Sequence, residues 1–227
     1  MAAKIIAAVN QKGGSGKTTL SMQLAGALAR RGHDVLIVDA DPQGTATRWA
    51  ASAEDDKPFP APVAGLAAAG GKVHREVQKY VDRYDYIIID CPPAVDSLAP
   101  QSALLVADLA VVPVIPSPPD LWASVGITKL IENARTVNEN LKAVIILNQC
   151  QPQQVLTKDA MEILKDFQVP LAVSYLGDRA VYRQSSLYGT SVHEMGTKAE
   201  AAIREISQLT EEILALLANG HEVAKES

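Results

Sequence analysis

Short apolar runs alternate along this chain with longer stretches in which apolar residues recur every three or four positions. An uninterrupted apolar run predicts a strand covered on both faces of a sheet, and the longer spacing predicts an amphipathic helix. The segments that predict strands are residues 5–9, 35–38, 62–66, 84–90, 109–114, 142–147 and 171–175. The segments that predict helices are residues 18–31, 72–83, 98–107, 120–137, 155–167 and 198–218.

The alternation predicts a doubly wound α/β fold, in which a mainly parallel twisted sheet carries helices on both faces. With 227 residues the chain can bury one sizeable core, so we expect a single domain over residues 1–227 that ends in a polar tail at 219–227. The hydrophobic share is 48% but the aromatic share is only 4%. Small and branched side chains of this kind suit buried strands under closely packed helices.

Composition also excludes several classes of protein. No apolar run reaches the roughly 20 residues that span a bilayer, and the N-terminus lacks a signal-peptide pattern, so we expect a cytoplasmic protein. Cys91 and Cys150 lack metal-ligand spacing and are expected to be free buried thiols. The net charge of −5 excludes an overall basic surface, so any contact with DNA must come from a local patch.

A glycine-rich segment follows the first predicted strand and leads directly into the first predicted helix. Glycines in this position let backbone N–H groups converge on phosphate oxygens at the positive end of the helix. Lys17 would then reach the β- and γ-phosphates, and the Thr18 hydroxyl would bind Mg²⁺. The residues expected to contact the nucleotide here are Gly13, Gly14, Ser15, Gly16, Lys17, Thr18 and Thr19.

Three aspartates follow predicted strands at the edge of the sheet where open α/β folds bind ligands. Asp41 could hydrogen-bond an attacking water, and Asp39 could hold Mg²⁺ through its hydration shell. The alternative is that both cap the helix expected near Thr45. Asp90 ends an isoleucine-rich strand and would hold Mg²⁺ through water, although an aspartate in such a place can also cap a helix.

The motifs together resemble the ParA/MinD family of deviant Walker A ATPases, most closely its small ParF-like partition members. The resemblance rests on Lys12 inside the glycine loop, on residues 39–43 (Asp-Ala-Asp-Pro-Gln), on residues 90–93 (Asp-Cys-Pro-Pro) and on the Pro-Ser-Pro turn at residues 116–118. That turn is followed by Asp120, which we expect to cap the next helix. In the family such a turn lies near the dimer interface, and a stiff turn is the equal alternative.

The resemblance implies that the chain binds ATP and Mg²⁺ and forms a homodimer with ATP. Lys12 would cross to the nucleotide of the other subunit, so the expected catalytic residues are Lys12, Lys17 and Asp41, and the expected metal residues are Thr18, Asp39 and Asp90. Asn148 would pair with adenine, with a turn-forming asparagine as the alternative. Asp178 lies in the loop that packs along the base in the family.

The implied function is an ATPase with a slow intrinsic rate that segregates or positions plasmid or chromosome DNA over the nucleoid. A ParB- or ParG-like partner would stimulate hydrolysis, and the ATP dimer would bind DNA non-specifically, without membrane contact, in the nucleoid region of the cytoplasm. The candidate DNA-binding residues are Arg179, Arg183, Lys198 and Arg204. The alternatives are the same ATPase acting on a protein assembly, such as a chemoreceptor cluster or microcompartment, and a nucleotide-gated adaptor with negligible turnover.

Overall fold

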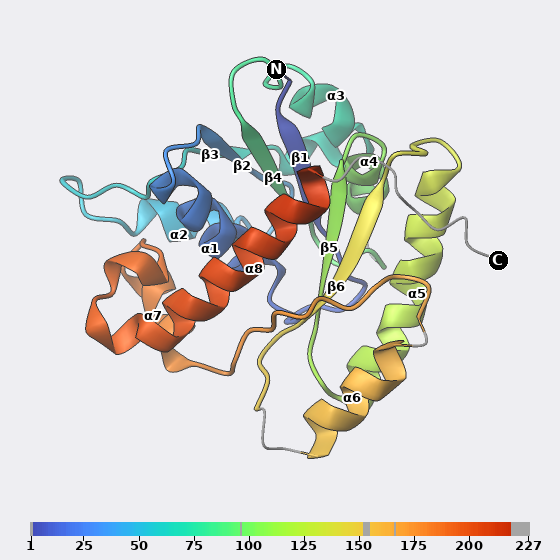
Figure 1. Ribbon diagram of the computed structural model, residues 1–227. Helices are drawn as coiled ribbons and strands as arrows, with labels where there is room; N and C mark the ends of the chain where they lie inside the picture. Colours follow the sequence, from blue (N-terminus) through green and yellow to red (C-terminus); the bar gives the residue numbers. More distant parts are fainter. Residues whose placement is uncertain (1, 96, 152–154, 166, 219–227) are drawn as a thin grey trace.

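In the computed structural model, strands that lie far apart in the sequence meet in one parallel sheet of six strands (Figure 1). Their spatial order is β3-β2-β4-β1-β5-β6, so β1 lies between β4 and β5. The structure describes residues 2–95, 97–151, 155–165 and 167–218. The strands are β1 Lys4–Ala8, β2 Val35–Asp39, β3 Val63–Gly65, β4 Tyr86–Asp90, β5 Leu109–Val114 and β6 Lys142–Leu147.

The helices form two layers because alternate residues of each strand point to opposite faces. On β1, Ile5 and Ala7 enter a core that also holds residues of α3 to α6, whereas Ile6 and Ala8 enter a core with residues of α1, α2, α7 and α8. The α-helices are α1 Lys17–Arg30, α2 Thr45–Ala51, α3 Val73–Val77, α4 Ala99–Leu104, α5 Pro118–Arg135, α6 Val155–Lys165, α7 Ala180–Leu187 and α8 Glu200–Ala218. Short 3₁₀ turns are η1 Ala67–Lys72, η2 Val192–Glu194 and η3 Thr197–Ala199. The predicted doubly wound fold is therefore confirmed.

The predicted strand at residues 171–175 was wrong. Within this segment, Leu171 forms an isolated bridge to Ile145 of β6, and the Ala172 N–H donates to the Ile145 oxygen at 2.8 Å. The backbone N–H groups of Val173 and Ser174 instead donate to the carboxylate of Glu212 on α8, at 2.8 and 2.9 Å. A distant helix supplies the hydrogen bonds that a neighbouring strand would otherwise provide.

Three local predictions also changed. The predicted helix at residues 72–83 is regular only over α3, and α7 was not predicted at all. Asp120 is not the N-cap of α5: that place belongs to Ser117, whose hydroxyl accepts from the Asp120 N–H. Pro118 then occupies the first helical position, where its missing N–H costs nothing.

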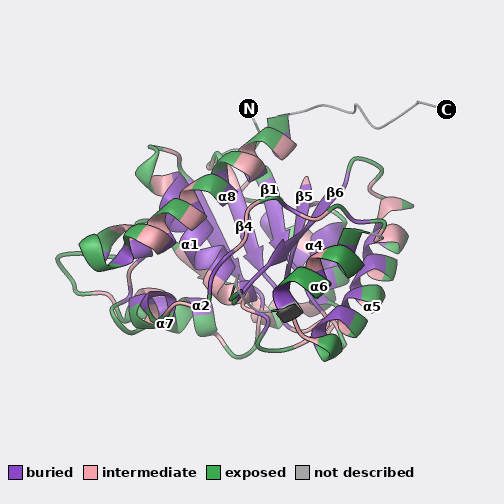
Figure 2. Cartoon of the chain, turned by 60° about the horizontal axis from the view of Figure 1, so that its bottom comes forward, coloured by how far each residue is buried: buried purple, intermediate pink, exposed green. Residues whose placement is uncertain are grey.

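The carboxyl ends of the strands lie at the bottom of Figure 1, the side that comes forward in Figure 2. The burial colouring shows helices with buried inner sides and exposed outer sides around a buried sheet (Figure 2). No helix in the described ranges combines the length and the apolarity that crossing a membrane requires. The tail at 219–227 lies outside the described residues, so its predicted polar character is not tested.

Candidate nucleotide-binding site

The glycine loop between β1 and α1 needs glycine at specific positions. Gly14 and Gly16 have φ values of 78° and 92°, in the left-handed region that side chains disfavour. Gly16 is the N-cap of α1, and a Cβ added to it would lie 2.0 Å from the side-chain nitrogen of Asn148. The loop therefore places the unpaired N–H groups of the α1 N-terminus beside an open site for an anion.

Lys17 is the first residue of α1, and its side chain is buried. Its Nζ donates to the backbone oxygen of Lys12 at 3.1 Å. Burial lowers the pKa of Lys17, while the nearby carboxylate of Asp90 opposes that shift. A desolvated ammonium gains most from an anion that restores its lost hydration, as a phosphate would.

Asp90 is fully buried at the end of β4, and burial raises its pKa to about 7, against a hydrogen bond from Thr18 that lowers it. Its Oδ1 lies 3.4 Å from the Ser21 hydroxyl, but its Oδ2 is buried without a hydrogen-bond partner. A buried carboxylate oxygen without a partner next to Thr18 fits a hydrated Mg²⁺, which keeps several waters and few protein ligands. Within the described part of the chain, no cluster of three or more His, Cys, Asp or Glu suited to a metal occurs.

Asp39 and Asp41 have different surroundings. The buried carboxylate of Asp39 accepts from the Thr47 N–H and hydroxyl, both at 2.8 Å, and from the Asp41 N–H at 3.2 Å. These contacts stabilise the first turn of α2, in agreement with the alternative in which Asp39 caps this helix. Asp41 is half-buried, and its carboxylate accepts from the Gln43 N–H at 2.9 Å. Asp41 is thus the better candidate of the two to hydrogen-bond an attacking water. The role of Asp41 toward that water and the role of Asp39 toward Mg²⁺ stay predictions.

The two amides after β6, Asn148 and Gln149, have different surroundings. Asn148 is buried behind the loop, where it donates to the Ser15 oxygen at 2.8 Å and accepts from the Gln149 N–H at 2.9 Å. These contacts brace the loop, so the predicted pairing with adenine receives no support from this arrangement. Gln149 has a φ of 54° and points its amide toward the Gly14 oxygen, at 3.4 Å. The Asn-Gln pair was visible in the sequence, but its division of labour was not.

A cleft of about 390 Å³ joins these parts. The loop forms one wall, and Asp41, Gln43 and Thr45 border it from the β2–α2 segment. Gln43, Thr45, Pro93 and Gln149 were not predicted as site residues. Its lining residues are Gly13, Gly14, Gly16, Lys17, Thr18, Thr19, Asp41, Gln43, Thr45, Pro93 and Gln149.

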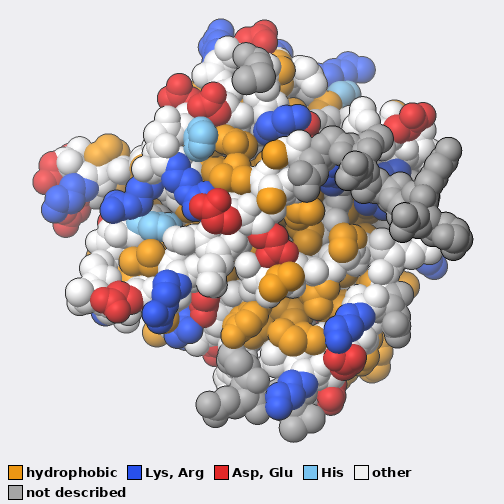
Figure 3. All heavy atoms as spheres, viewed as in Figure 1, with side chains coloured by type: hydrophobic (Ala, Val, Ile, Leu, Met, Phe, Trp, Pro, Cys, Tyr) orange, Lys and Arg blue, Asp and Glu red, His pale blue; other side chains and the backbone are white. Residues whose placement is uncertain are grey.

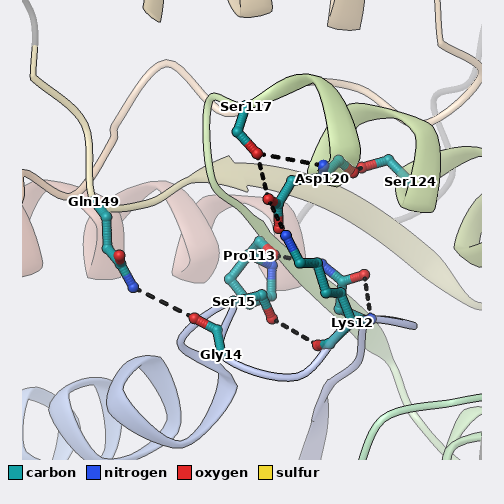
Figure 4. A network of polar contacts seen from close by, with 9 residues as sticks. Lys12, Gly14, Ser15, Pro113, Ser117, Asp120, Ser124 and Gln149 are labelled. Atoms are coloured by element: carbon teal, nitrogen blue, oxygen red, sulfur yellow. Dashed lines mark hydrogen bonds and ion pairs between the residues drawn. The ribbon is translucent and has the colours of Figure 1, made fainter.

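Lys12 is held within its own chain in this structure. Its Nζ lies 2.6 Å from the carboxylate of Asp120, which is only 2% exposed, while the Lys12 side chain is 41% exposed (Figure 4). The Ser117 hydroxyl contacts the same Asp120 oxygen, and the other oxygen, Oδ1, has no hydrogen-bond partner. Lys12 is therefore the partner that offsets the buried charge of Asp120, and it sits at the edge of the loop where it can be reached from outside.

The candidate DNA-binding residues lie on neighbouring elements, but two of them form ion pairs with acidic side chains. Arg179 pairs with Glu205 at 2.6 Å, and Arg183 pairs with Asp178 at 2.9 Å. Lys198 lies 5.8 Å from the centre of the Tyr188 ring. Figure 3 shows acidic side chains interspersed with basic ones on the face that carries α7 and α8.

Asp178 does not line the cleft beside the glycine loop. It borders a separate cavity of about 310 Å³ with Arg179 and Lys198. Its predicted place beside the base thus gains no contact in this structure, and the contact of the four cations with DNA stays a prediction.

The chain matches the model of the CobQ/CobB/MinD/ParA nucleotide-binding domain over residues 6–192. It is 35% identical over 209 residues to the maintenance of carboxysome distribution protein A of Halothiobacillus neapolitanus, covering 92% of this chain and 95% of that protein. It is 32% identical to the sporulation initiation inhibitor protein Soj of Bacillus subtilis, covering 63% of this chain and 70% of Soj. Among solved structures, an ATP complex of a McdA variant from Cyanothece superimposes with a TM-score of 0.75 at 16% identity, covering 99% and 100% of the two chains.

Proposed function

The chain belongs to the CobQ/CobB/MinD/ParA nucleotide-binding family, and we propose that it is an ATP-dependent dimerising switch that distributes a protein assembly in the cell. A partner protein stimulates its slow hydrolysis of ATP. The observation that supports a protein assembly as the cargo is the 35% identity to a carboxysome distribution protein over nearly the full length of both chains. The similarity to Soj covers less of this chain, at 63%. The comparisons thus favour the alternative cargo over the DNA cargo that the motifs first suggested.

The residues of the cleft have the chemistry for MgATP. The N–H groups at the start of α1 and the ammonium of Lys17 would hold the phosphates. The Thr18 hydroxyl, with Asp90 through water, would hold Mg²⁺, which would supply positive charge to the phosphate oxygens. Asp41 accepts a hydrogen bond from the attacking water and orients it. Among the described residues, no arginine lines the cleft, so the added cation of a fast ATPase has to come from outside.

Nucleoid association is the remaining part of this proposal. Lys198 and Arg204 are the candidates left after the pairing of Arg179 and Arg183, so attraction to DNA requires the doubled charge of the dimer and falls steeply with salt. With only these two candidate cations per subunit, we expect the contact with DNA to be weak. Weak, non-specific contact suits a protein that redistributes over the nucleoid while it positions another object.

Deletion of the gene in its host tests the cargo. We expect protein assemblies such as carboxysomes to cluster instead of spreading, and plasmids and chromosomes to be inherited normally. Wild-type protein should restore the spacing, and the Lys17→Ala variant at equal abundance should not. Normal spacing of assemblies combined with frequent loss of plasmid or chromosomal DNA would show that the cargo is DNA and not a protein assembly.

Replacement of Lys12 tests the switch. We expect Lys12→Gln to weaken ATP-dependent dimerisation and to leave ADP affinity nearly unchanged, because Lys12 serves the nucleotide of the other subunit. The measurement is light scattering with each nucleotide, paired with ADP titration. Loss of Lys12 also leaves Asp120 buried and unpaired, so the matched control is the double variant with Asp120→Asn, which removes that charge. If the double variant dimerises normally with ATP, Lys12 has no role across the interface.

A further inference from the structure

The helix α2 follows one wall of the nucleotide cleft and has little buried surface of its own. It has only seven residues, and Trp49 is one of just two that are buried. The segment before it borders the cleft with Asp41, Gln43 and Thr45. The Asp41 backbone oxygen accepts from the N–H of Gly44, the N-cap of α2, at 2.8 Å. The place of the Asp41 carboxylate therefore depends on where α2 lies.

Trp49 joins α2 to the turn after α7, residues 188–191. The Trp49 side chain is buried, and its indole N–H donates to the Thr190 backbone oxygen at 3.0 Å. Gly189 of the same turn has a φ of 61°, and a Cβ added to it would collide with the backbone nitrogen of Ala53, just beyond the end of α2. The turn thus holds α2 by a hydrogen bond and by a backbone contact that has no room for a side chain.

This turn and the residues on either side of it are also bound to α1, the helix that begins at the phosphate loop (Figure 1). The Gln23 side chain of α1 is buried; its oxygen accepts from the Val192 N–H at 2.8 Å, and its nitrogen donates to the Ser185 hydroxyl at 2.9 Å. At Gly26 an added Cβ would lie 2.6 Å from the Cβ of Ser191. The turn after α7 therefore links α1 to α2, whose N-terminal ends meet at the cleft.

We propose that Trp49 is a positioning residue for ATP hydrolysis: through the turn after α7 it fixes α2, and with α2 the Asp41 carboxylate, relative to the phosphate loop. The inference rests on the proposed hydrolysis of ATP, in which Asp41 orients the attacking water. Trp49 is not among the residues that line the cleft, so it acts through α2. A misplacement of about 1 Å at the reacting atoms can lower a rate by roughly 10²-fold, whereas the binding of ADP depends on α1 and its loop.

The variant Trp49→Phe tests this role, because it keeps most of the apolar volume and removes the indole N–H. We expect hydrolysis of bound MgATP in a single turnover to slow by about tenfold or more, and the dissociation constant of MgADP to change by less than about twofold. The ATP-dependent dimer, followed by light scattering, should persist. Both constants are measured well below the unfolding temperature of each variant.

The matched control for lost packing is Leu209→Ala. Leu209 lies on α8, is buried and belongs to the same core as Trp49. The cavity left by its replacement should lower the thermal midpoint at least as much as Trp49→Phe does. Because the cavity is not part of the link between α1 and α2, the rate of hydrolysis and the affinity for MgADP should stay at the wild-type values.

The variant Gly189→Ala disturbs the same link by pressing on α2 instead of loosening it. We expect it also to slow hydrolysis and to leave MgADP affinity unchanged. Its matched control is Gly32→Ala, because Gly32 has a φ of 85° but nothing lies within 4 Å of an added Cβ. Both variants have the same kind of backbone strain, and only Gly189→Ala meets α2. If Gly189→Ala does not fold, Trp49→Phe and its control decide the question.

Three results would count against the proposal. Hydrolysis at the wild-type rate in Trp49→Phe, or an equal loss of rate in Leu209→Ala, would overturn the positioning role and leave the proposed ATPase intact. A parallel loss of MgADP affinity in Trp49→Phe would show that Trp49 supports the site as a whole, which also overturns it. A wild-type protein that binds MgATP without hydrolysing it would overturn both the positioning role and the proposed hydrolysis.

Discussion

Replacement of Lys17 by alanine or methionine is expected to weaken ATP binding by roughly 100-fold or more without destabilising the apo protein. The ammonium is buried at the start of α1, and its Nζ donates to a backbone oxygen. If it makes two charge-assisted bonds to phosphate, each contributing about 1.5 kcal/mol or more, its loss weakens binding by roughly 100-fold or more. This is the largest effect expected for a single residue of the loop.

Although replacement of Lys17 weakens ATP binding, we expect it to maintain or raise the stability of the apo protein. Since burial lowers the pKa of Lys17 in the folded protein, its charged form is less favourable there than in the unfolded chain at any pH below that pKa. Lys17→Met removes this cost and keeps much of the side-chain volume, so the apo variant should unfold at the same temperature as the wild type or higher.

Thermal unfolding with and without MgATP measures both effects at once. Wild-type protein should gain about 2.7 kcal/mol of stability at an ATP concentration 100 times the dissociation constant, and the Lys17 variants, which bind roughly 100-fold more weakly, should gain about 0.4 kcal/mol or less. Lys4→Met is the matched control, because Lys4 lies at the opposite end of β1, where it pairs with Asp108. A Lys17 variant that unfolds far below the wild type without nucleotide would show that the lysine has a structural role instead.

Replacement of Asp41 is expected to separate ATP binding from hydrolysis. Asp41→Ala should bind ATP normally and lower stimulated phosphate release by roughly 10²- to 10⁴-fold, the usual contribution of a positioned acid or base. The ATP dimer should then persist, because its nucleotide is not consumed. Asp41 is suited to this role because it borders the cleft and its carboxylate is bonded within the described residues only to the Gln43 N–H.

The matched comparison is between Asp41→Asn and Asp39→Asn. An asparagine at position 41 can still accept from the Gln43 N–H, so the turn survives and only the carboxylate is lost. At position 39 the carboxylate accepts from Thr47 and Asp41, so its replacement should lower the thermal midpoint. Phosphate release and unfolding temperature are measured for both. Stimulated turnover at the wild-type rate in Asp41→Asn would remove Asp41 from the reaction.

The sequence by itself determined the order of the elements and the phosphate loop. Buried parallel strands are apolar throughout, so their runs are visible without any partner, and the predicted strands at β1, β2, β4, β5 and β6 all appear in the sheet. The glycine loop was equally visible because its conformation depends on residues that are adjacent in sequence, as the positive φ values of Gly14 and Gly16 show.

Only the tertiary structure decided which polar side chain meets which. Asn148 braces Ser15 while Gln149 borders the cleft, Asp39 fastens α2, and Lys12 rests on Asp120 from a segment 108 residues away. The order of strands in the sheet sets these meetings, because it brings the ends of β1, β5 and β6 side by side. Propensity and spacing describe neighbours along the chain, whereas the partner of a buried charge is chosen by which distant element covers it.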